Sequence, residues 1–223
     1  MDATGNGSER RGRKARRTRG TLARHAFELV LERGLRGVTV EEIAQAADVD
    51  RRTFSRYFPN KESAVLDAVR GDGDRINRAL RARPDAEPPL TAYRRAVLDW
   101  LGDPEAEPWH LRPRFFDLLV MAEEEPTLYA AFHHIRVDAQ EESVAILAAR
   151  LAVDPRQDLR PAVAVAAGAG ALLAAQAAWV RSGRPAALPE FVVHAFDALS
   201  ADLLEPRQGG AAPHSTTEES TPS

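Results

Sequence analysis

The chain has 223 residues, 44% of them hydrophobic, and carries a formal net charge of −3. It has room for one large domain or two small ones with a buried core, and the absence of cysteine excludes disulfides and thiolate chemistry. No apolar segment follows the charged N-terminal residues, so we expect no signal peptide and a cytoplasmic protein.

Charge is distributed unevenly along the chain. Residues 10–61 include fourteen basic and six acidic side chains, a net charge of +8 that leaves −11 for the remainder. This asymmetry indicates an acidic body with a head that faces a polyanion. Residues 1–15 are polar and basic and contain glycine, which predicts a flexible arm. The basic residues expected to reach a DNA minor groove or an adjoining backbone are Arg13, Lys14, Arg16, Arg17 and Arg19.

The ordered segments are rich in helix-forming residues and poor in β-branched runs, so we predict an all-α fold. Apolar residues at helical spacing predict a first helix from about Thr18 to Arg33, followed by Gly34 as a left-handed stop. Thr39 is expected to cap a second helix, with Glu42 as its capping-box partner.

A third helix is predicted to follow Asp50, which is a second good N-cap. Phe54 and Phe58 lie four residues apart and are expected to face inward together, leaving the arginines outside. With the second helix and the short turn, this segment predicts a helix-turn-helix over about residues 39–58, whose second helix enters the DNA major groove. The residues expected to contact bases or phosphates are Thr39, Arg51, Arg52, Thr53, Ser55, Arg56, Tyr57 and Lys61. The alternative is a solvated basic face on a small helical bundle.

The segment GLRGVTVEEIAQAADVDRRTFSRYFPNKESAVLDAV, residues 34–69, resembles the N-terminal domain of the tetracycline-repressor (TetR) family of bacterial transcriptional regulators. The resemblance extends over about residues 16–76. Asp48 stands where members usually have a turn glycine, and Ser55 where they often have an aromatic residue that touches the DNA backbone. The resemblance implies a homodimer, each protomer joining this domain to a larger helical domain that binds a small molecule. The arginine-rich arm and the alanine-rich penultimate helix look most like a branch associated with acyl-CoA-like ligands.

A fourth helix is expected to be capped by Asn60 and to join the two domains, with a bend near Asp72 because Gly71 and Gly73 weaken it. Further helices are predicted near 90–101, 109–124, 127–151, 157–182 and 188–204. The predicted domain boundaries are a flexible basic arm at 1–15, a DNA-binding domain at 16–76, a ligand-binding and dimerisation domain at 77–205 and a disordered tail at 206–223.

The segment PAVAVAAGAGALLAAQAAWV, residues 161–180, is nearly free of charge. Its length would suit a membrane span, but Ala and Gly contribute little transfer energy, so we expect a buried helix and no membrane partner. Small residues at four-residue spacing, with a matching stripe on the last helix, predict a four-helix interface between two chains. The residues expected there are Ala166, Gly170, Ala174, Phe191, Ala195 and Leu199. Packing within one chain is the alternative.

A ligand pocket is expected among the middle helices. Its predicted lining is Trp100, Trp109, His110, Phe115, Phe116, Leu119, Met121, Phe132, His133 and Arg136; for each of these residues ordinary core packing is the alternative. His133 and the adjacent His134 point about 100° apart on a helix and lack further ligands, so we predict no metal site.

No nucleophile paired with a base, phosphate-cradling glycine loop or telling carboxylate pair is found, so we expect neither an enzyme nor a cofactor. The sequence predicts a DNA-binding transcriptional regulator, a repressor that a small molecule releases from a palindromic operator. The alternatives are a DNA-binding protein without a ligand and a helical module that binds only small molecules or proteins.

Overall fold

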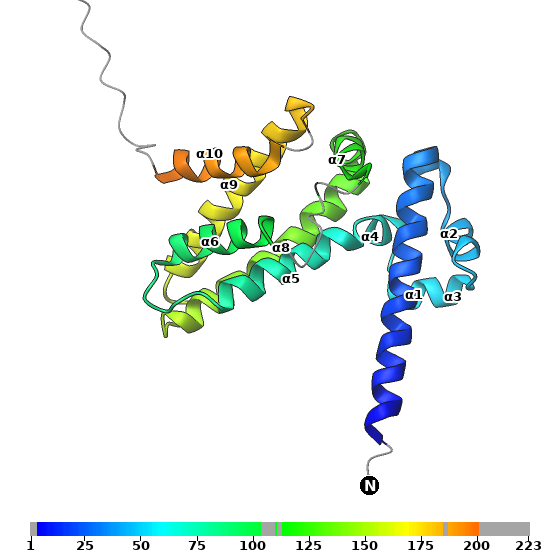
Figure 1. Cartoon of the computed structure of the whole chain (residues 1–223), viewed down its shortest axis with the longest axis horizontal. Helices are drawn as coiled ribbons and strands as arrows, with labels where there is room; N and C mark the ends of the chain where they lie inside the picture. Colours follow the sequence, from blue (N-terminus) through cyan, green and yellow to red (C-terminus); the bar gives the residue numbers. More distant parts are fainter. Residues whose placement is uncertain (1–3, 104–109, 111–112, 185–186, 201–223) are drawn as a thin grey trace, which may run out of the picture.

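The computed structural model describes residues 4–103, 110, 113–184 and 187–200, and every regular element in them is a helix (Figure 1). The predicted all-α fold is therefore confirmed. The elements are α1 (Thr4–Arg33), the 3-10 turn η1 (Leu35–Gly37), α2 (Val40–Ala46), α3 (Arg51–Tyr57), α4 (Lys61–Val65), α5 (Asp67–Arg81), α6 (Pro89–Leu101), α7 (Phe115–Glu124), α8 (Pro126–Arg150), α9 (Arg160–Ser182) and α10 (Leu188–Ser200).

The head comprises α1 to α4 and is built on one apolar face of α1. Leu22, Ala26 and Val30, at four-residue spacing, are completely buried against α2 and α4. Gly34 has a φ of 75°, which only glycine adopts without strain, and it ends α1 so that Leu35 folds back into the core. This left-handed stop was predicted from the sequence.

The N-terminal arm is helical, so the prediction of a flexible segment over residues 1–15 is wrong from Thr4 onward; residues 1–3 lie outside the described chain. The predicted start near Thr18 is wrong for the same reason. From Arg10 to Arg17 the chain consists mostly of Arg, Lys and Ala, which are strong helix formers and favour an extension of the helix from its packed half. Figure 1 shows this extension of α1 running past α2 and α3 into open space.

The connection from the head to the body bends in a different place from the one predicted. The helical run is interrupted at Leu66, between α4 and α5, and α5 continues without a break through Asp72. Gly73 is needed for packing rather than for bending, since a Cβ on it would lie 2.7 Å from the Cβ of Ala139 on α8. The glycine that was expected to weaken the helix instead allows α5 and α8 to approach each other closely.

The body consists of α5 to α10. In it α5 packs against α6 and α8, and α9 packs against α6, α8 and α10. The bounds of α6, α8 and α9 follow the predicted segments closely, whereas α7 begins at Phe115 and the predicted tail at 206–223 lies outside the described residues.

Among the described helices, α9 is long and apolar enough to cross a membrane. It is instead a core helix, because Trp179 is completely buried and Ala164, Gly168 and Leu172 also face the interior.

Head and body meet where α7 begins. The Phe115 ring stacks on Phe27 of α1 with 6.1 Å between centroids, and Arg114 donates a 2.8 Å hydrogen bond to the carbonyl oxygen of Leu31. The body thus contacts the head through α7 as well as through α5 and α8, which both pack against α4.

Candidate nucleic-acid interface and ligand cavity

The turn between α2 and α3 is held by side-chain caps at both helix starts. Thr39 and Glu42 form a capping box, with 3.2 Å from the Glu42 amide to the Thr39 hydroxyl and 2.8 Å for the reciprocal bond. Asp48 adopts a φ of 55° in the turn, and Asp50 accepts a 2.6 Å hydrogen bond from the Thr53 amide at the start of α3. Hydrogen bonds from Thr39 and Thr53 lower the pKa values of Glu42 and Asp50. Both caps were predicted; the Thr39 cap fixes the start of α2 and the Asp50 cap fixes the start of α3.

Two phenyl rings anchor α3 to the head. Phe54 and Phe58 are each 1% exposed, and their ring centroids lie 5.7 Å apart. The opposite side of α3 is exposed to solvent over Arg51, Arg52, Ser55 and Arg56. The prediction that the two phenyl rings face the core and the arginines face solvent is therefore confirmed.

The arginines of α3 differ in their surroundings. Arg51 forms an ion pair of 2.7 Å with Glu41 of α2, and both side chains are largely exposed. In the described part of the chain no acidic side chain lies within ion-pair distance of Arg52. Arg56 lies over the ring of its neighbour Tyr57 at 5.1 Å. The tip of α3 therefore keeps a positive charge, because an exposed ion pair is worth little.

Lys61 does not point freely toward solvent, as a phosphate-binding lysine would. Its ammonium group donates hydrogen bonds of 2.6 and 2.7 Å to the carbonyl oxygens of Leu35 and Val38. It therefore joins the start of α4 to the chain between α1 and α2. The predicted phosphate contact would have to use its remaining donor.

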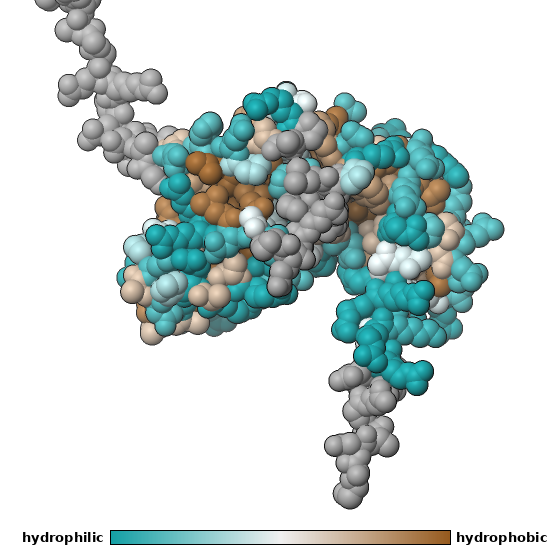
Figure 2. All heavy atoms as spheres, viewed as in Figure 1, coloured by the Kyte–Doolittle hydropathy of each residue, from teal (hydrophilic) through white to brown (hydrophobic). Residues whose placement is uncertain are grey.

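The basic residues of α1 fall into two groups. Arg13, Lys14, Arg16 and Arg17 are exposed along the projecting part of the helix, which is hydrophilic in Figure 2. Arg19 is different, because it donates bonds of 2.9 and 2.6 Å to a carboxylate oxygen of Asp67 and lies 4.7 Å from the Phe58 ring centroid. This ion pair joins α1 to α5, and the DNA contact expected of Arg19 stays a prediction.

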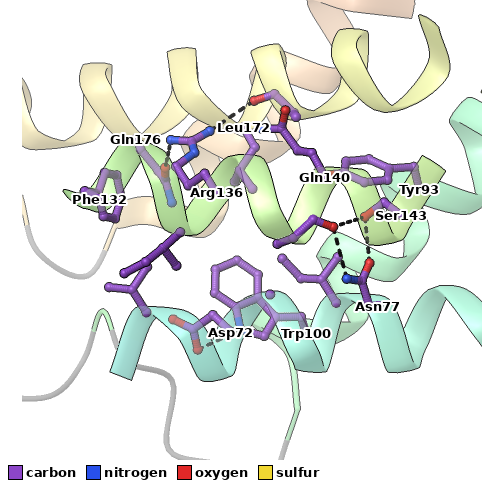
Figure 3. A pocket seen from close by; sticks show the side chains of 16 residues that line it. Asp72, Asn77, Tyr93, Trp100, Phe132, Arg136, Gln140, Ser143, Leu172 and Gln176 are labelled. Atoms are coloured by element: carbon purple, nitrogen blue, oxygen red, sulfur yellow. Dashed lines mark hydrogen bonds between the residues drawn. The ribbon is translucent and has the colours of Figure 1, made fainter. Parts of the chain in front are cut away.

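A cavity of about 70 Å³ lies inside the body between α5, α6, α8 and α9 (Figure 3). Polar side chains line its two ends and aromatic and aliphatic ones its walls. The lining residues are Val69, Asp72, Gly73, Ile76, Asn77, Tyr93, Trp100, Phe132, Ile135, Arg136, Ala139, Gln140, Ser143, Ala169, Leu172 and Gln176.

Three predicted pocket residues, Trp100, Phe132 and Arg136, do line this cavity. Leu119 lines a neighbouring hollow of about 280 Å³ between α7, α8 and α9, which shares Phe132 and Gln176 with the cavity.

The other predicted pocket residues lie elsewhere. His110 and Phe116 pack against Trp179, Phe115 packs against α1, and Met121 is half-buried against the core. His133 is exposed, and Trp109 lies outside the described residues. For these apolar residues core packing was the better interpretation, since helical spacing shows burial but not what is buried against it.

One end of the cavity is cationic. The Arg136 guanidinium donates to Gln176 at 3.0 Å and to the carbonyl oxygen of Ala169 at 3.3 Å, and it lies 5.6 Å from the Phe132 ring centroid. Burial lowers the pKa of Arg136 and raises that of Tyr93 to about 12, so at neutral pH the guanidinium is charged and the phenol neutral.

Several other polar groups that line the cavity bond to their neighbours. The Ser143 hydroxyl donates to the Asn77 side chain at 2.6 Å, and the Asn77 amide donates to the carbonyl oxygen of Ala139 at 3.1 Å. Asp72 pairs with Arg75 and accepts a 3.3 Å bond from the Trp100 indole. Figure 3 shows Asp72 and Asn77 on α5, away from Arg136 and Gln176.

Sequence reasoning missed the polar cavity residues Asp72, Asn77, Tyr93, Gln140, Ser143 and Gln176. Gln176 left a signal, because it is the one amide in the apolar run 161–180. The others lie on helices with many polar residues, where nothing local separates a cavity position from a solvent-facing one.

The residues predicted to form the dimer interface differ in how exposed they are to solvent. Ala166, Gly170 and Ala174 are exposed on α9, whereas Phe191, Ala195 and Leu199 of α10 are half-buried against their own core. Larger apolar side chains extend the exposed face of α9: Leu159 is 69% exposed, Val163 61% and Leu173 40%. Figure 2 shows apolar surface between α6 and α10 on the same body.

Two family models match the chain. The model described as bacterial regulatory proteins of the tetR family matches residues 22–68, and one described as the MftR C-terminal domain matches residues 87–204.

Named relatives span most of the chain. TcmR, an HTH-type transcriptional regulator of Streptomyces glaucescens, is 37% identical over 171 residues, 74% of this chain and 74% of that protein. MftR of Mycobacterium tuberculosis, named for mycofactocin biosynthesis, is 28% identical over 201 residues, covering 84% and 93%. The crystal structure of a transcriptional regulator from Rhodococcus sp. Rha1 has a TM-score of 0.44 at 24% identity, covering 81% of this chain and 92% of that one.

Proposed function

The chain belongs to the TetR family of bacterial regulatory proteins and is a DNA-binding transcriptional regulator, and we propose that it is a repressor released from its operator by a small molecule. The observation that supports this most directly is the capped α3 helix, anchored by Phe54 and Phe58 and exposed over Arg51 and Arg52. Its relatives are transcriptional regulators rather than enzymes.

In the proposed complex, α3 enters the major groove with its N-terminus toward the bases. Arg52 and Arg51 are the base-reading candidates, because a guanidinium matches the two acceptors of guanine. The hydroxyls of Thr39, Thr53, Ser55 and Tyr57, together with Arg56, would contact phosphates and set the register. The exposed residues Arg13, Lys14, Arg16 and Arg17 would follow the backbone as a rigid helix.

The protein is proposed to act as a homodimer in the cytoplasm. The exposed apolar face of α9 supports an isologous contact in which the same face meets its copy. Such a dimer would present two α3 helices to half-sites about 34–36 Å apart, which suits a palindromic operator.

The cavity offers a route from ligand to DNA. Asp72, Gly73 and Asn77 of α5 line it, and α5 continues through the break at Leu66 into α4 of the head. A ligand that moves α5 would change the spacing of the two α3 helices. Coupling of about 1–3 kcal/mol would lower operator affinity about 5- to 150-fold. An acyl-CoA-like effector stays a prediction, and it would require a larger opening than the present cavity.

The proposal is tested with DNA from upstream of the protein's own gene in a gel shift, beside scrambled DNA of equal length. We expect specific binding whose logarithm falls with log salt by about 0.9 per phosphate contact. Binding without sequence preference would contradict the operator, and no binding at all would favour a module that recognises only small molecules or proteins. Binding that no small molecule relieves would favour the ligand-independent alternative.

A further inference from the structure

Arg136 is a largely buried cation without an acidic partner. Within the described ranges no carboxylate lies within ion-pair distance of its guanidinium, whose two contacts are the neutral oxygens of Gln176 and Ala169. Asp72, which also lines the cavity, pairs with Arg75, and Glu142, which is bonded to the lining residue Asn77, pairs with Arg81. A buried charge is costly unless it is paired, so the Arg136 guanidinium would stabilise an anion that binds beside it.

A mainly apolar hollow lies beside the cavity that Arg136 lines. Phe132 and Gln176 separate the cavity from the hollow of about 280 Å³ between α7, α8 and α9. That hollow is lined mainly by apolar side chains such as Leu119 and Val180, and its polar members besides Gln176 are Glu123 and Tyr129. A molecule held at Arg136 therefore finds a cationic group at one end and apolar surface beyond Phe132.

We propose that Arg136 is the anion-binding residue of the effector site, and that the effector is an amphipathic organic acid. Its carboxylate pairs with the free N–H groups of the guanidinium, while Gln176 is positioned to share the contact. Its apolar body extends past Phe132 toward Leu119. This inference rests on the proposed function, since it assigns a ligand class to the cavity through which release would occur.

The test compares acids with their neutral analogues by titration calorimetry on the full-length protein. Decanoate against decanol represents aliphatic ligands, and 1-naphthoate against 1-naphthalenemethanol represents aromatic ones. A charge-assisted pair predicts that the acid of at least one pair binds about 10- to 100-fold more tightly than its alcohol. The arm that shows this preference identifies the class of apolar body. No preference in either arm would overturn the proposal.

Substitution then locates the anion site. Arg136→Met should reduce the preference to about one, while Arg136→Lys, which keeps the charge but not the fork, should retain part of it. Arg156→Met is the matched control, because Arg156 lies in the exposed loop before α9 and should leave the preference unchanged. A preference that survives in folded Arg136→Met protein, checked by circular dichroism, would refute the assignment to Arg136.

Chain length tests the apolar half. From butyrate to decanoate the affinity should rise about three- to fourfold per methylene while the chain fills the hollow. A flat series would refute the use of that hollow.

Operator release is measured separately by gel shift, which keeps the two proposals distinguishable. Acids that bind at Arg136 without releasing DNA would contradict the proposed ligand control alone. Release that is unchanged in Arg136→Met would contradict only the anion site.

Discussion

Arg51 and Arg52 are neighbours at the tip of α3, yet one is paired with Glu41 and the other is not. DNA must compete with the Glu41 carboxylate for Arg51, whereas Arg52 is available at once. The competition is weak, because the exposed pair is worth about 1 kcal/mol or less.

Arg52→Ala should lower affinity for the operator by about 1–3 kcal/mol and affinity for scrambled DNA much less, since a base-reading arginine carries specificity. Fluorescence anisotropy on both DNAs measures this difference. The control is Glu41→Gln, which should strengthen DNA binding by freeing Arg51. Equal losses on both DNAs would instead identify Arg52 as a phosphate contact.

Lys61 illustrates a residue whose charge serves the fold. Lys61→Met should lower the free energy of unfolding by about 1.5–3 kcal/mol, because two carbonyl oxygens lose a charged donor. Urea unfolding measures this, with Lys14→Met on the exposed part of α1 as the matched control for stability. If Lys61→Met instead leaves stability intact and reduces the salt dependence of DNA binding, the first prediction of a phosphate contact is right.

Among the elements, α5 shows how two glycines two residues apart have different roles. Gly73 lies against Ala139 of α8, whereas nothing lies within 4 Å of a Cβ placed on Gly71. The packing of α5 against α8 therefore requires glycine at position 73, whereas position 71 could carry a larger residue. The same contrast occurs in α9, where a Cβ on Gly168 would overlap the Tyr93 ring and one on Gly170 would have no atom of the described residues within 4 Å.

Gly71→Ala should raise the free energy of unfolding by about 0.5–1 kcal/mol through helix propensity. Gly73→Ala should lower it, because overpacking of about 1–3 kcal/mol outweighs that gain. Thermal and urea unfolding of the two variants provide the comparison. Equal stabilisation by both substitutions would show that α5 and α8 separate easily, which would itself bear on how a ligand enters.

At the scale of the whole molecule, two apolar surfaces need to be buried: the core of the body and one face of α9. The core of the body is complete, but the face of α9 that carries Val163, Gly170 and Leu173 is left exposed. With the exposed Ala166 between Val163 and Gly170, these positions lie three or four residues apart, so they form one stripe on the helix. In a two-fold dimer each residue of the stripe would occur in the interface twice, once from each protomer.

Val163→Glu should therefore raise the dimer dissociation constant at least about tenfold, since two carboxylates would be buried without partners. Val120→Glu is the matched control, because Val120 is an exposed valine on α7. Sedimentation velocity measures the association, and operator binding should weaken for a two-half-site DNA more than for a single half-site. A dimer that is unaffected by Val163→Glu would place the interface on another face.

The features that the sequence predicted correctly depend on interactions between residues close together in the chain. The caps at Thr39 and Asp50, the stop at Gly34 and the inward pair Phe54 and Phe58 each involve groups within about four residues of one another. Helical periodicity likewise shows which face of a segment is buried. For these reasons the all-helical fold and the orientation of α3 followed from the residues in order.

Pairings across the chain could not be read in the same way. Arg19 finds Asp67 across 48 positions, Asn77 finds Glu142 across 65, and Arg136 finds Gln176 across 40. A buried face does not specify which helix covers it, so the cavity and the clamps arise only once the helices are packed. The same basic side chain is a DNA contact or an internal clamp according to where a distant carboxylate or carbonyl comes to lie.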